Sequence, residues 1–318
     1  MLDNMATVDA LSPAYAAATQ AAALVDRSEM GKLLLTGEEA GAFLDGQVSN
    51  ETTALETGRG RYATLLTNKG RMLGDLRVIA VDAEEPALLL ITERVALQAL
   101  FDQLRRGLIG WKAELHKRTL ELSLFSIVGP EADRVVAAAG LPVPGPEEHD
   151  VAGDVVRTDM GLDVLPAADR AGDVRAALIV AGAIEAPEAV AEIVRVEHGR
   201  PRYGLDLDDS VMPEEAGIVD RAVSFTKGCY VGQETVARLH WKGKPNRRLR
   251  GLRLTEPATP GDAVRSGDRE VGTVGSAVVS PRLGPIALAI LRREVQPGDT
   301  VTVAAAGAAA DVVAPPFA

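Results

Sequence analysis

The sequence predicts an α+β protein of three parts, and three observations lead to this fold class. The chain has 318 residues, which exceeds the roughly 100–200 residues of an ordinary domain. A similar order of strands and helices occurs twice, which suggests two related α+β halves. After residue 246, short apolar runs alternate with turns about every ten residues, as in a small antiparallel β-barrel or sandwich.

The first half is expected over residues 14–120. A strand at "KLLLT" leads into a helix at 36–47, with Thr36 as its N-cap and Glu39 as the capping-box partner. Strand-like runs "GRYATLLT" and "GRMLGDLRVIAVD" meet at "NKG", and "ALLLITE" and a helix "RVALQALFDQLRRG" follow. The pattern predicts a strand meander covered by a helix.

The second half is expected over residues 121–244 and repeats that order. It contains strand "TLELSLFSIVG", helix "PEADRVVAAAG", strands near "DVVRTDMGLDVLPA" and helix "APEAVAEIVRVEHG". The third part, expected over 245–318, contains the runs "RLRGLRLT", "REVGTVGSAVVS", "PIALAILRR" and "DTVTV". Two Pro-Gly-Asp turns, at 260–262 and 297–299, separate them.

Composition excludes several classes of protein. A single cysteine allows no internal disulfide and no zinc or cluster site built from this chain alone, and favours a reducing cytoplasm. The N-terminus lacks the basic and apolar regions of a signal peptide, and no apolar run reaches the ~18 residues of a membrane span. A net charge of −11 argues against general nucleic-acid binding. No His-Glu-x-x-His, Walker A or dinucleotide motif occurs.

The single cysteine lies in "FTKGCYVGQETVARLH". Lys227 precedes Cys229 by two residues, and a nearby ammonium favours a thiolate, while Gly228 and Gly232 permit an open, shaped loop. These residues predict an exposed loop on which the lysine and the thiol face a common space. Two alternatives stay open: a small buried residue in a tight turn, and the nucleophile of a Cys-His pair.

Two further features carry chemistry. Between Arg238 and Arg253 lie seven Lys or Arg residues with Trp241 and no acid, which predicts a local attractor for a polyanion, an RNA-binding patch or a solvated linker. Glu197, near the end of a predicted helix, offers two coplanar acceptor oxygens that match an aminopyrimidine edge.

Together these blocks resemble a known family. "RVEHGRPRYGLDL", "MPEEAGI" and "SFTKGCYVGQETVARLHWKGKPNRRL" are similar to the YgfZ branch of the folate-binding, GcvT-like aminomethyltransferase superfamily, as are "LTGEEAGAFLDGQVSNE" and "YATLLTNKGRMLGDLRV" upstream. The resemblance implies a three-domain ring with a central hole for tetrahydrofolate and a terminal β-barrel. It also implies that Glu197 meets the pterin.

The resemblance further implies roles for individual residues and partners. Cys229 and Lys227 form the functional pair, and the folate contacts are Glu197, Asp75, Tyr203, Arg238 and Gln233. Proteins of the YgfZ branch act in assembly, maturation or repair of iron–sulfur proteins, including enzymes that modify tRNA, and Cys229 could ligate a cluster transiently. The expected partners are folate, including polyglutamylated forms, and iron–sulfur client or assembly proteins, with no membrane and no direct nucleic acid.

The rival within the superfamily is the glycine-cleavage aminomethyltransferase. The corresponding hairpin of that enzyme usually carries an Asp-Asp pair at the folate reaction centre, whereas this chain has Gly74-Asp75. The expectation is therefore a folate-binding protein without independent turnover. Folate-dependent aminomethyl transfer, or another one-carbon transfer, remains the alternative.

Overall fold

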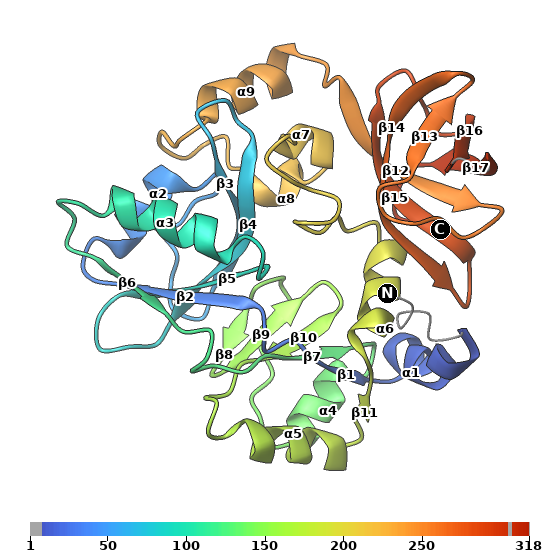
Figure 1. Cartoon of the computed structure of the whole chain (residues 1–318). Coiled ribbons are helices and arrows are strands. Elements are labelled where there is room, and N and C mark those ends of the chain that lie inside the picture. The colour runs from blue at the N-terminus through green and yellow to red at the C-terminus, as the bar shows by residue number, and fades with distance from the viewer. Residues whose placement is uncertain (1–7, 305–306, 318) are drawn as a thin grey trace.

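The computed structural model describes residues 8–304 and 307–317, and Figure 1 shows three lobes arranged around a central helix. Two lobes are sheets covered by helices, and the third is a closed β-barrel at the C-terminal end. The predicted α+β class with a terminal antiparallel barrel is confirmed. Among the described residues, no helix has the length and apolar character needed to cross a membrane; the cytoplasmic location stays a prediction.

The first sheet is antiparallel, in the order β3-β4-β5-β2-β6. Its strands are β2 (Gly31–Thr36), β3 (Gly60–Leu66), β4 (Met72–Val81), β5 (Ala87–Thr92) and β6 (Glu114–Lys117). Helices α2 (Ala40–Gln47) and α3 (Leu97–Gly107) bury Phe43, Leu44, Leu100 and Leu104 against it. Burial of these apolar side chains, at about 25 cal/mol per Å², holds the layers together.

The predicted start of the first helix is wrong. Thr36 is the last residue of β2, and α2 begins at Ala40 with Glu39 at the N-cap position and no side-chain capping bond. Gly37 makes the turn instead, with φ of +116°, and a Cβ there would lie 2.8 Å from Ala113 Cα. The Glu39 carboxylate accepts the backbone N–H of Lys112 at 2.7 Å, which ties the helix start to the approach to β6.

The second sheet has the order β11-β1-β7-β10-β9-β8, with β1 and β11 parallel and the other neighbours antiparallel. Its strands are β1 (Ala23–Asp26), β7 (Phe125–Val128), β8 (Val151–Ala152), β9 (Val155–Thr158), β10 (Gly161–Val164) and β11 (Ile184–Glu185). Helices α4 (Ala132–Ala138) and α5 (Ala171–Val180) cover one face, and α1 (Val8–Gln20) and α6 (Glu188–Glu197) cover the other.

The two α+β lobes exchange chain segments. Strand β1, which precedes the first sheet in sequence, pairs with β7 and β11 of the second sheet. Conversely, α7 (Pro213–Ala216), α8 (Val219–Ala222) and α9 (Gln233–Lys242) pack on the hairpin of β3 and β4. The limits 14–120, 121–244 and 245–318 stay a prediction, and residues 305, 306 and 318 of the third range lie outside the described residues.

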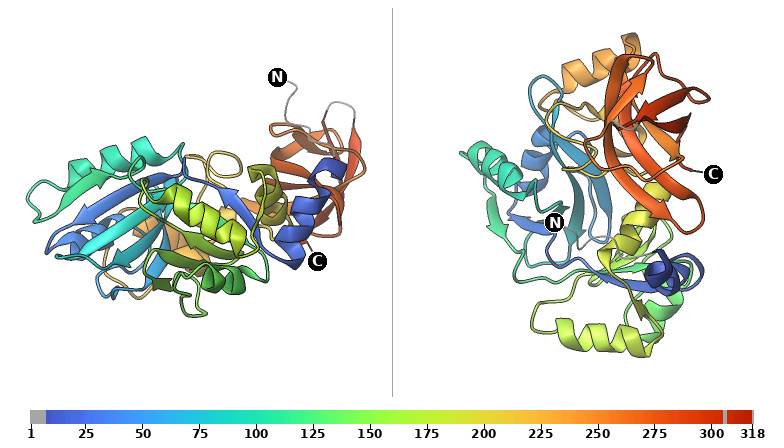
Figure 2. Two further views of the ribbon diagram at one scale, coloured as in Figure 1. Left: turned by 90° about the horizontal axis from the view of Figure 1, so that it is seen from below. Right: turned by 45° about the vertical axis from the view of Figure 1, so that its right-hand side comes forward.

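The barrel closes in the order β12-β15-β14-β13-β16-β17. Its strands are β12 (Arg247–Leu254), β13 (Ala263–Ser266), β14 (Arg269–Ser280), β15 (Gly284–Arg292), β16 (Thr300–Val303) and β17 (Ala308–Val313). Helix α6 packs against β14 and β15 as well as against the second sheet, so it joins two lobes. Both views of Figure 2 show it between the barrel and the second sheet. The chain after α6 then crosses to the first sheet.

Candidate functional site

A cavity of about 170 Å³ lies where the two sheets and the end of α6 meet. One wall comes from β3, β4 and β5, and the opposite wall from β9, β10 and the turn between them. The segment after α6 and helix α8 complete it. The polar lining residues are Arg27, Tyr62, Asp75, Arg77, Thr92, Glu93, Glu148, His149, Thr158, Asp159, Asp163, Arg195, Arg200, Arg202 and Arg221.

Asp75 is the carboxyl of this cavity without a cationic partner. Its Oδ2 accepts the Tyr62 hydroxyl at 2.6 Å, and its backbone carbonyl accepts the Thr92 hydroxyl at 2.6 Å. Among the described residues it has no ion pair, and it is 9% exposed. Burial raises the pKa of Asp75 to about 6, against which the Tyr62 hydrogen bond acts. This acid therefore titrates close to neutral pH.

The other charges around the cavity are paired. Arg77 lies 2.6 Å from Asp163 across the two sheets, and Arg202 bridges Glu93 at 2.9 Å and Glu188 at 3.0 Å. These contacts fix the two α+β lobes relative to one another, because each joins side chains from both. These ion pairs leave Asp75 as a carboxyl of the cavity that has no cationic partner among the described residues.

Asp159 is the second carboxylate at the cavity. It lies 2.5 Å from Arg200 Nε and 3.4 Å from Arg221. Arg221 also pairs with Glu148 and covers the Tyr62 ring, with its guanidinium carbon 5.3 Å from the ring centre.

Three buried nitrogens at the cavity lack a hydrogen-bond partner in the described part of the chain. Arg200 Nε lies 2.5 Å from a carboxylate oxygen of Asp159, which leaves His149 Nδ1, 3.8 Å from Glu148, and Arg221 Nε. Burial lowers the pKa of His149 to about 4, with Arg77 adding to the effect, so the ring is neutral. An unsatisfied buried polar group costs about 1–3 kcal/mol. A ligand with a polar edge would satisfy both nitrogens.

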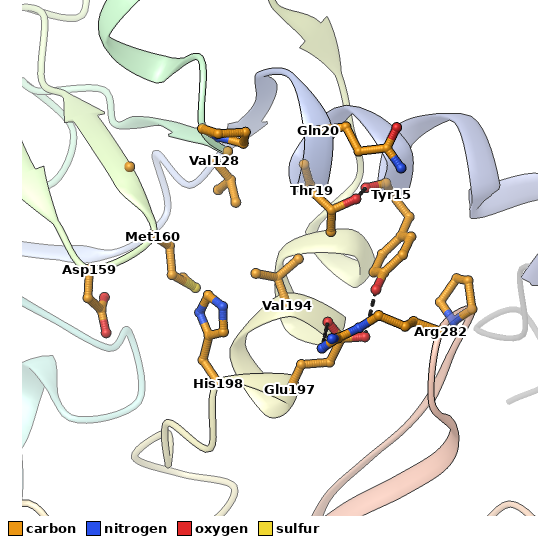
Figure 3. A pocket seen from close by; sticks show the side chains of 15 residues that line it. Tyr15, Thr19, Gln20, Val128, Asp159, Met160, Val194, Glu197, His198 and Arg282 are labelled. Carbon is orange, nitrogen blue, oxygen red and sulfur yellow. Dashed lines mark hydrogen bonds and ion pairs between the residues drawn. The ribbon is translucent and has the colours of Figure 1, made fainter. Parts of the chain in front are cut away.

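A larger pocket of about 720 Å³ adjoins the cavity, and the two share Asp159 and Met160. Figure 3 shows it between α1, the end of α6 and the turn after β14, with Glu197 and Tyr15 on one side and His198 on the other. Glu197 thus lies at this pocket, whereas Asp75 lines the cavity beyond the shared residues. The two predicted acids face neighbouring spaces.

Glu197 is already held by protein groups. It is 3% exposed, and its Oε1 accepts the Tyr15 hydroxyl at 2.7 Å and the Ser280 hydroxyl. Among the described residues, Arg282 is the polar partner of its Oε2, at 3.5 Å, and the Arg282 side chain is 56% exposed (Figure 3). Burial raises the pKa of Tyr15, and the neighbouring Glu197 adds to it. One carboxylate oxygen could therefore reach a ligand if Arg282 swings away.

The structure does not bring all the predicted folate contacts together. Tyr203 lines a hollow of about 350 Å³ with Glu93 and Arg202, next to the cavity, and burial raises its pKa to about 12. Gln233 and Arg238 lie on α9 and line neither the cavity nor the pocket of Glu197. No residue of 238–253 lines either space.

Cys229 is exposed, as the sequence predicts, but Lys227 does not share its surroundings. The Lys227 side chain is fully buried. Its ammonium donates hydrogen bonds to the backbone carbonyls of Asp45 and Val48 and lies 3.1 Å from the Asp45 carboxylate. The ring centre of Tyr230 is 5.1 Å from the same ammonium. The expectation that lysine and thiol face a common space is wrong. Lys227 points inward because the end of α2 offers it unpaired carbonyls.

Gly74 explains why the acidic pair is incomplete. A Cβ at this position would overlap Leu100 Cδ1 and lie 3.0 Å from Ala96 Cβ, both at α3. Because α3 approaches β4 closely, a side chain at position 74 would require Leu100 and the start of α3 to shift. Asp75 points to the opposite face of the strand, into the cavity, and is kept.

Sequence reasoning missed Tyr62, His149, Asp159 and Arg221, which complete the cavity. They come from four separate segments, and no local pattern marks them. Among the described residues no group of three or more His, Cys, Asp or Glu side chains is arranged to hold a metal ion.

Comparisons with known proteins agree with this architecture. Residues 6–150 match the family described as "GCVT N-terminal domain", and residues 247–318 match "Glycine cleavage T-protein C-terminal barrel domain". The solved glycine cleavage system aminomethyltransferase T from Bartonella henselae superposes with a TM-score of 0.86 at 23% identity, over 96% of this chain and 89% of that one. At that identity the likeness shows the fold.

Two curated relatives are similar over most of their length. A chloroplastic protein of Arabidopsis thaliana, named only as a transferase, is 26% identical over 88% of this chain and 68% of its own. The aminomethyltransferase of Mycobacterium leprae is 28% identical over 95% of this chain and 87% of its own. The two matched domains, the shared fold and these relatives agree: residues 6–150 and 247–318 are similar to the N-terminal domain and the C-terminal barrel domain of the glycine cleavage T-protein, and the chain has the fold of that protein.

Proposed function

We propose that this protein binds a reduced folate in the central cavity and that Asp75 is the acid–base group at the bound ligand. The observation that carries the proposal is the buried Asp75 carboxyl without an ion pair, in the same cavity as His149 Nδ1 and Arg221 Nε, which lack a hydrogen-bond partner among the described residues. A group with a pKa of about 6 exchanges protons efficiently at neutral pH. The aminomethyltransferase family to which the chain is related supports folate as the ligand.

The chemistry of the lining fits a reduced pterin. The pterin edge presents N–H donors and a carbonyl acceptor, for which the Asp159 side chain offers acceptor oxygens and Arg221 Nε a donor. Asp75, which has no ion pair among the described residues, would accept or return a proton at a pterin nitrogen. Tetrahydrofolate, when bound, supplies the nitrogens that take up a one-carbon unit. Arg77 and Arg202, held by their own acids, keep the two walls in place.

Size indicates that the ligand extends beyond the cavity. Ligand pockets usually span about 300–1,000 Å³, and the cavity alone has about 170 Å³. The adjoining pocket of about 720 Å³ shares Asp159 and Met160 with it. We therefore propose that one folate molecule spans both spaces, which keeps contact with Glu197 as a prediction.

For the use of the bound folate, the relatives and Asp75 favour one-carbon transfer of the aminomethyl type. Their names are those of aminomethyltransferases or a transferase. The absent first acid of the Asp-Asp pair does not argue strongly against this, because position 74 faces α3 and the acid at the cavity is retained.

Calorimetry with tetrahydrofolate under reducing conditions tests the binding. Asp75→Asn should weaken affinity by about tenfold or more, because hydrogen bonds to charged groups contribute about 1.5–3 kcal/mol. Asp82→Asn, on the exposed loop after β4, is the matched control and should leave affinity unchanged. Absence of heat at millimolar folate would refute the proposal.

Turnover is tested separately, with an aminomethyl-loaded carrier protein and tetrahydrofolate. Production of methylenetetrahydrofolate should fall about 10²–10⁴-fold in Asp75→Asn, the usual contribution of a general acid or base. Binding without turnover in the wild type would exclude aminomethyl transfer and leave the folate site standing.

A second candidate function is a folate-dependent role in maturation or repair of iron–sulfur proteins. The observation that favours it is the exposed Cys229 in the Lys-Gly-Cys-Tyr-x-Gly-Gln-Glu block that resembles the YgfZ branch. One thiolate could hold a cluster only with ligands from a partner. Loss of iron–sulfur enzyme activity in a deletion strain, restored by the wild type and not by Cys229→Ser, would support it; full restoration by Cys229→Ser would refute it.

A further inference from the structure

The outer side of α9 presents a tryptophan among cations. Arg238, Trp241 and Lys242 stand at positions i, i+3 and i+4, so they share one face of the helix, and all three are exposed. Lys244 follows the helix and is also exposed. We call these four residues the α9 patch. Helix α9 lies at the periphery of the molecule, away from the central helix α6 (Figures 1 and 2).

Trp241 is held in place although it is 69% exposed. Its ring meets Phe225 edge-on at 5.6 Å and His240 edge-on at 4.8 Å, and Phe225 stacks on His240 at 4.3 Å. A large aromatic ring that its neighbours already fix loses little side-chain entropy on binding. Such rings are frequent energetic centres of protein interfaces.

In the part of the chain that the structure describes, the cations of the patch have no acidic partner. Among the described residues, none of Arg238, Lys242 and Lys244 has an ion pair. Glu234 lies in the first turn of α9, and Glu214 Oε2 lies 3.2 Å from the ring nitrogen of His240, the residue before Trp241. The chain as a whole has a formal net charge of −11 at pH 7, so the patch is a local positively charged surface on an acidic protein.

We propose that the α9 patch is the docking surface for an acidic protein partner. Carboxylates of the partner pair with Arg238, Lys242 and Lys244, and an apolar side chain of the partner covers Trp241. Charge complementarity of this kind steers encounter and selects partners. The proposal is independent of folate, because no residue of the patch lines the cavity or the pocket.

The arrangement favours protein over RNA. Proteins that bind single strands offer successive rings on which bases stack, whereas here Phe225 and His240 stack on each other and leave one free ring. An extended polyanion would also meet the negative charge of the rest of the surface.

Fluorescence of Trp241 provides the test. The chain has two tryptophans, and Trp111→Phe leaves Trp241 as the single reporter; Trp111 packs edge-on against Phe43, so a phenyl ring is a mild replacement. The probe is a short amidated peptide of Asp and Glu around one Leu-Phe pair. A second peptide has Ser-Ser in place of that pair, and oligouridylate is the nucleic-acid probe.

The first peptide should bind with a blue shift of the Trp241 emission, and added salt should weaken it. Lys242→Glu with Lys244→Glu should reduce affinity at least about tenfold, since like charges then face each other. Trp241→Ala, followed by calorimetry, should reduce it about thirtyfold, the loss typical of a hot-spot residue. Arg105→Glu with Arg106→Glu, exposed at the end of α3, has the same charge change and should leave affinity unchanged.

Three results would overturn the proposal. If the Ser-Ser peptide binds as tightly as the Leu-Phe peptide, Trp241 does not bind an apolar side chain of the partner. If the α3 control variant loses as much affinity as the Lys242→Glu, Lys244→Glu variant, the loss reflects the net charge of the protein and not the α9 patch. Tighter binding of oligouridylate than of the peptide through Trp241, Lys242 and Lys244 would make the α9 patch a nucleic-acid surface.

Discussion

The Tyr62 hydroxyl donates a hydrogen bond of 2.6 Å to Asp75 across the β3–β4 ladder. In this register Tyr62 is opposite Arg77, so Asp75, two residues earlier on β4, is the diagonal neighbour of Tyr62 on the same face. Burial raises the pKa values of both groups. The tyrosine therefore stays protonated as a donor, and the carboxyl is the member of the pair that titrates near neutrality.

The first prediction concerns stability and pH. Because the folded-state pKa of Asp75 is raised to about 6 from 3.8, the folded state binds a proton that the unfolded state does not bind between these values. The stability contribution of Asp75 is therefore lost as pH rises through this window. Asp75→Asn should be more stable than the wild type at about pH 7.5, by at most about 3 kcal/mol, and the gain should vanish towards about pH 4.

Urea denaturation at several pH values measures this gain. Asp82→Asn, at an exposed position on the following loop, is the control and should show no such pH dependence. A gain from Asp75→Asn that is the same at every pH would show that the carboxyl is not the source.

The second prediction uses Tyr62→Phe. The tyrosine hydrogen bond favours the ionised form of Asp75, so its removal should raise the pKa of Asp75 further. The acid limb of the pH profile for folate binding or turnover should move to higher pH, while the folded structure stays close to that of the wild type. Tyr230→Phe, at a buried tyrosine outside the cavity, is the matched control. If the acid limb does not move in Tyr62→Phe, Asp75 is not the group whose titration the pH profile reports.

Local patterns predicted the elements better than their partners. Alternating apolar runs predicted β14 and β15, but "AAADVV" lacks β-branched residues in its first half, so β17 was missed; closure of the barrel between β12 and β16 stabilises it. Strand β1 was not assigned to the second sheet, because its pairing with β7 joins residues about a hundred positions apart and leaves no local trace.

The site shows the same limit. Asp75 and Tyr203 were found by resemblance and lie at the cavity or next to it, and Glu197 lies at the adjoining pocket. His149 and Arg221 were not found, since each comes from a loop or a short helix whose position depends on packing. The inward direction of Lys227 was not predictable either, because its partner Asp45 is on a distant helix.

The third prediction is that Gly74→Asp does not recreate an acidic pair. A side chain at position 74 meets Leu100 and Ala96 rather than the cavity, so the variant should be destabilised by about 1–3 kcal/mol, as for overpacked cores, or more because a carboxylate is buried. Gly74→Ala should lose only the part of the stability that the steric clash costs. Leu100→Ala should relieve that clash, so the double variant should lose less free energy of unfolding than the sum of the two single variants. Gly74→Asp with unchanged stability and higher turnover would contradict this.

The last prediction separates the cysteine from its lysine. Lys227 is a buried anchor whose removal leaves Asp45 without its cation, so Lys227→Met should lower stability by about 3–5 kcal/mol. Cys229 is exposed, so Cys229→Ser should change stability by no more than about 0.5 kcal/mol and leave folate affinity unchanged. Native-state alkylation of the wild type should be fast, and it should modify the thiol without unfolding the chain. If Cys229→Ser destabilises the protein as much as Lys227→Met does, the thiol is a structural group, and the iron–sulfur role loses its supporting residue.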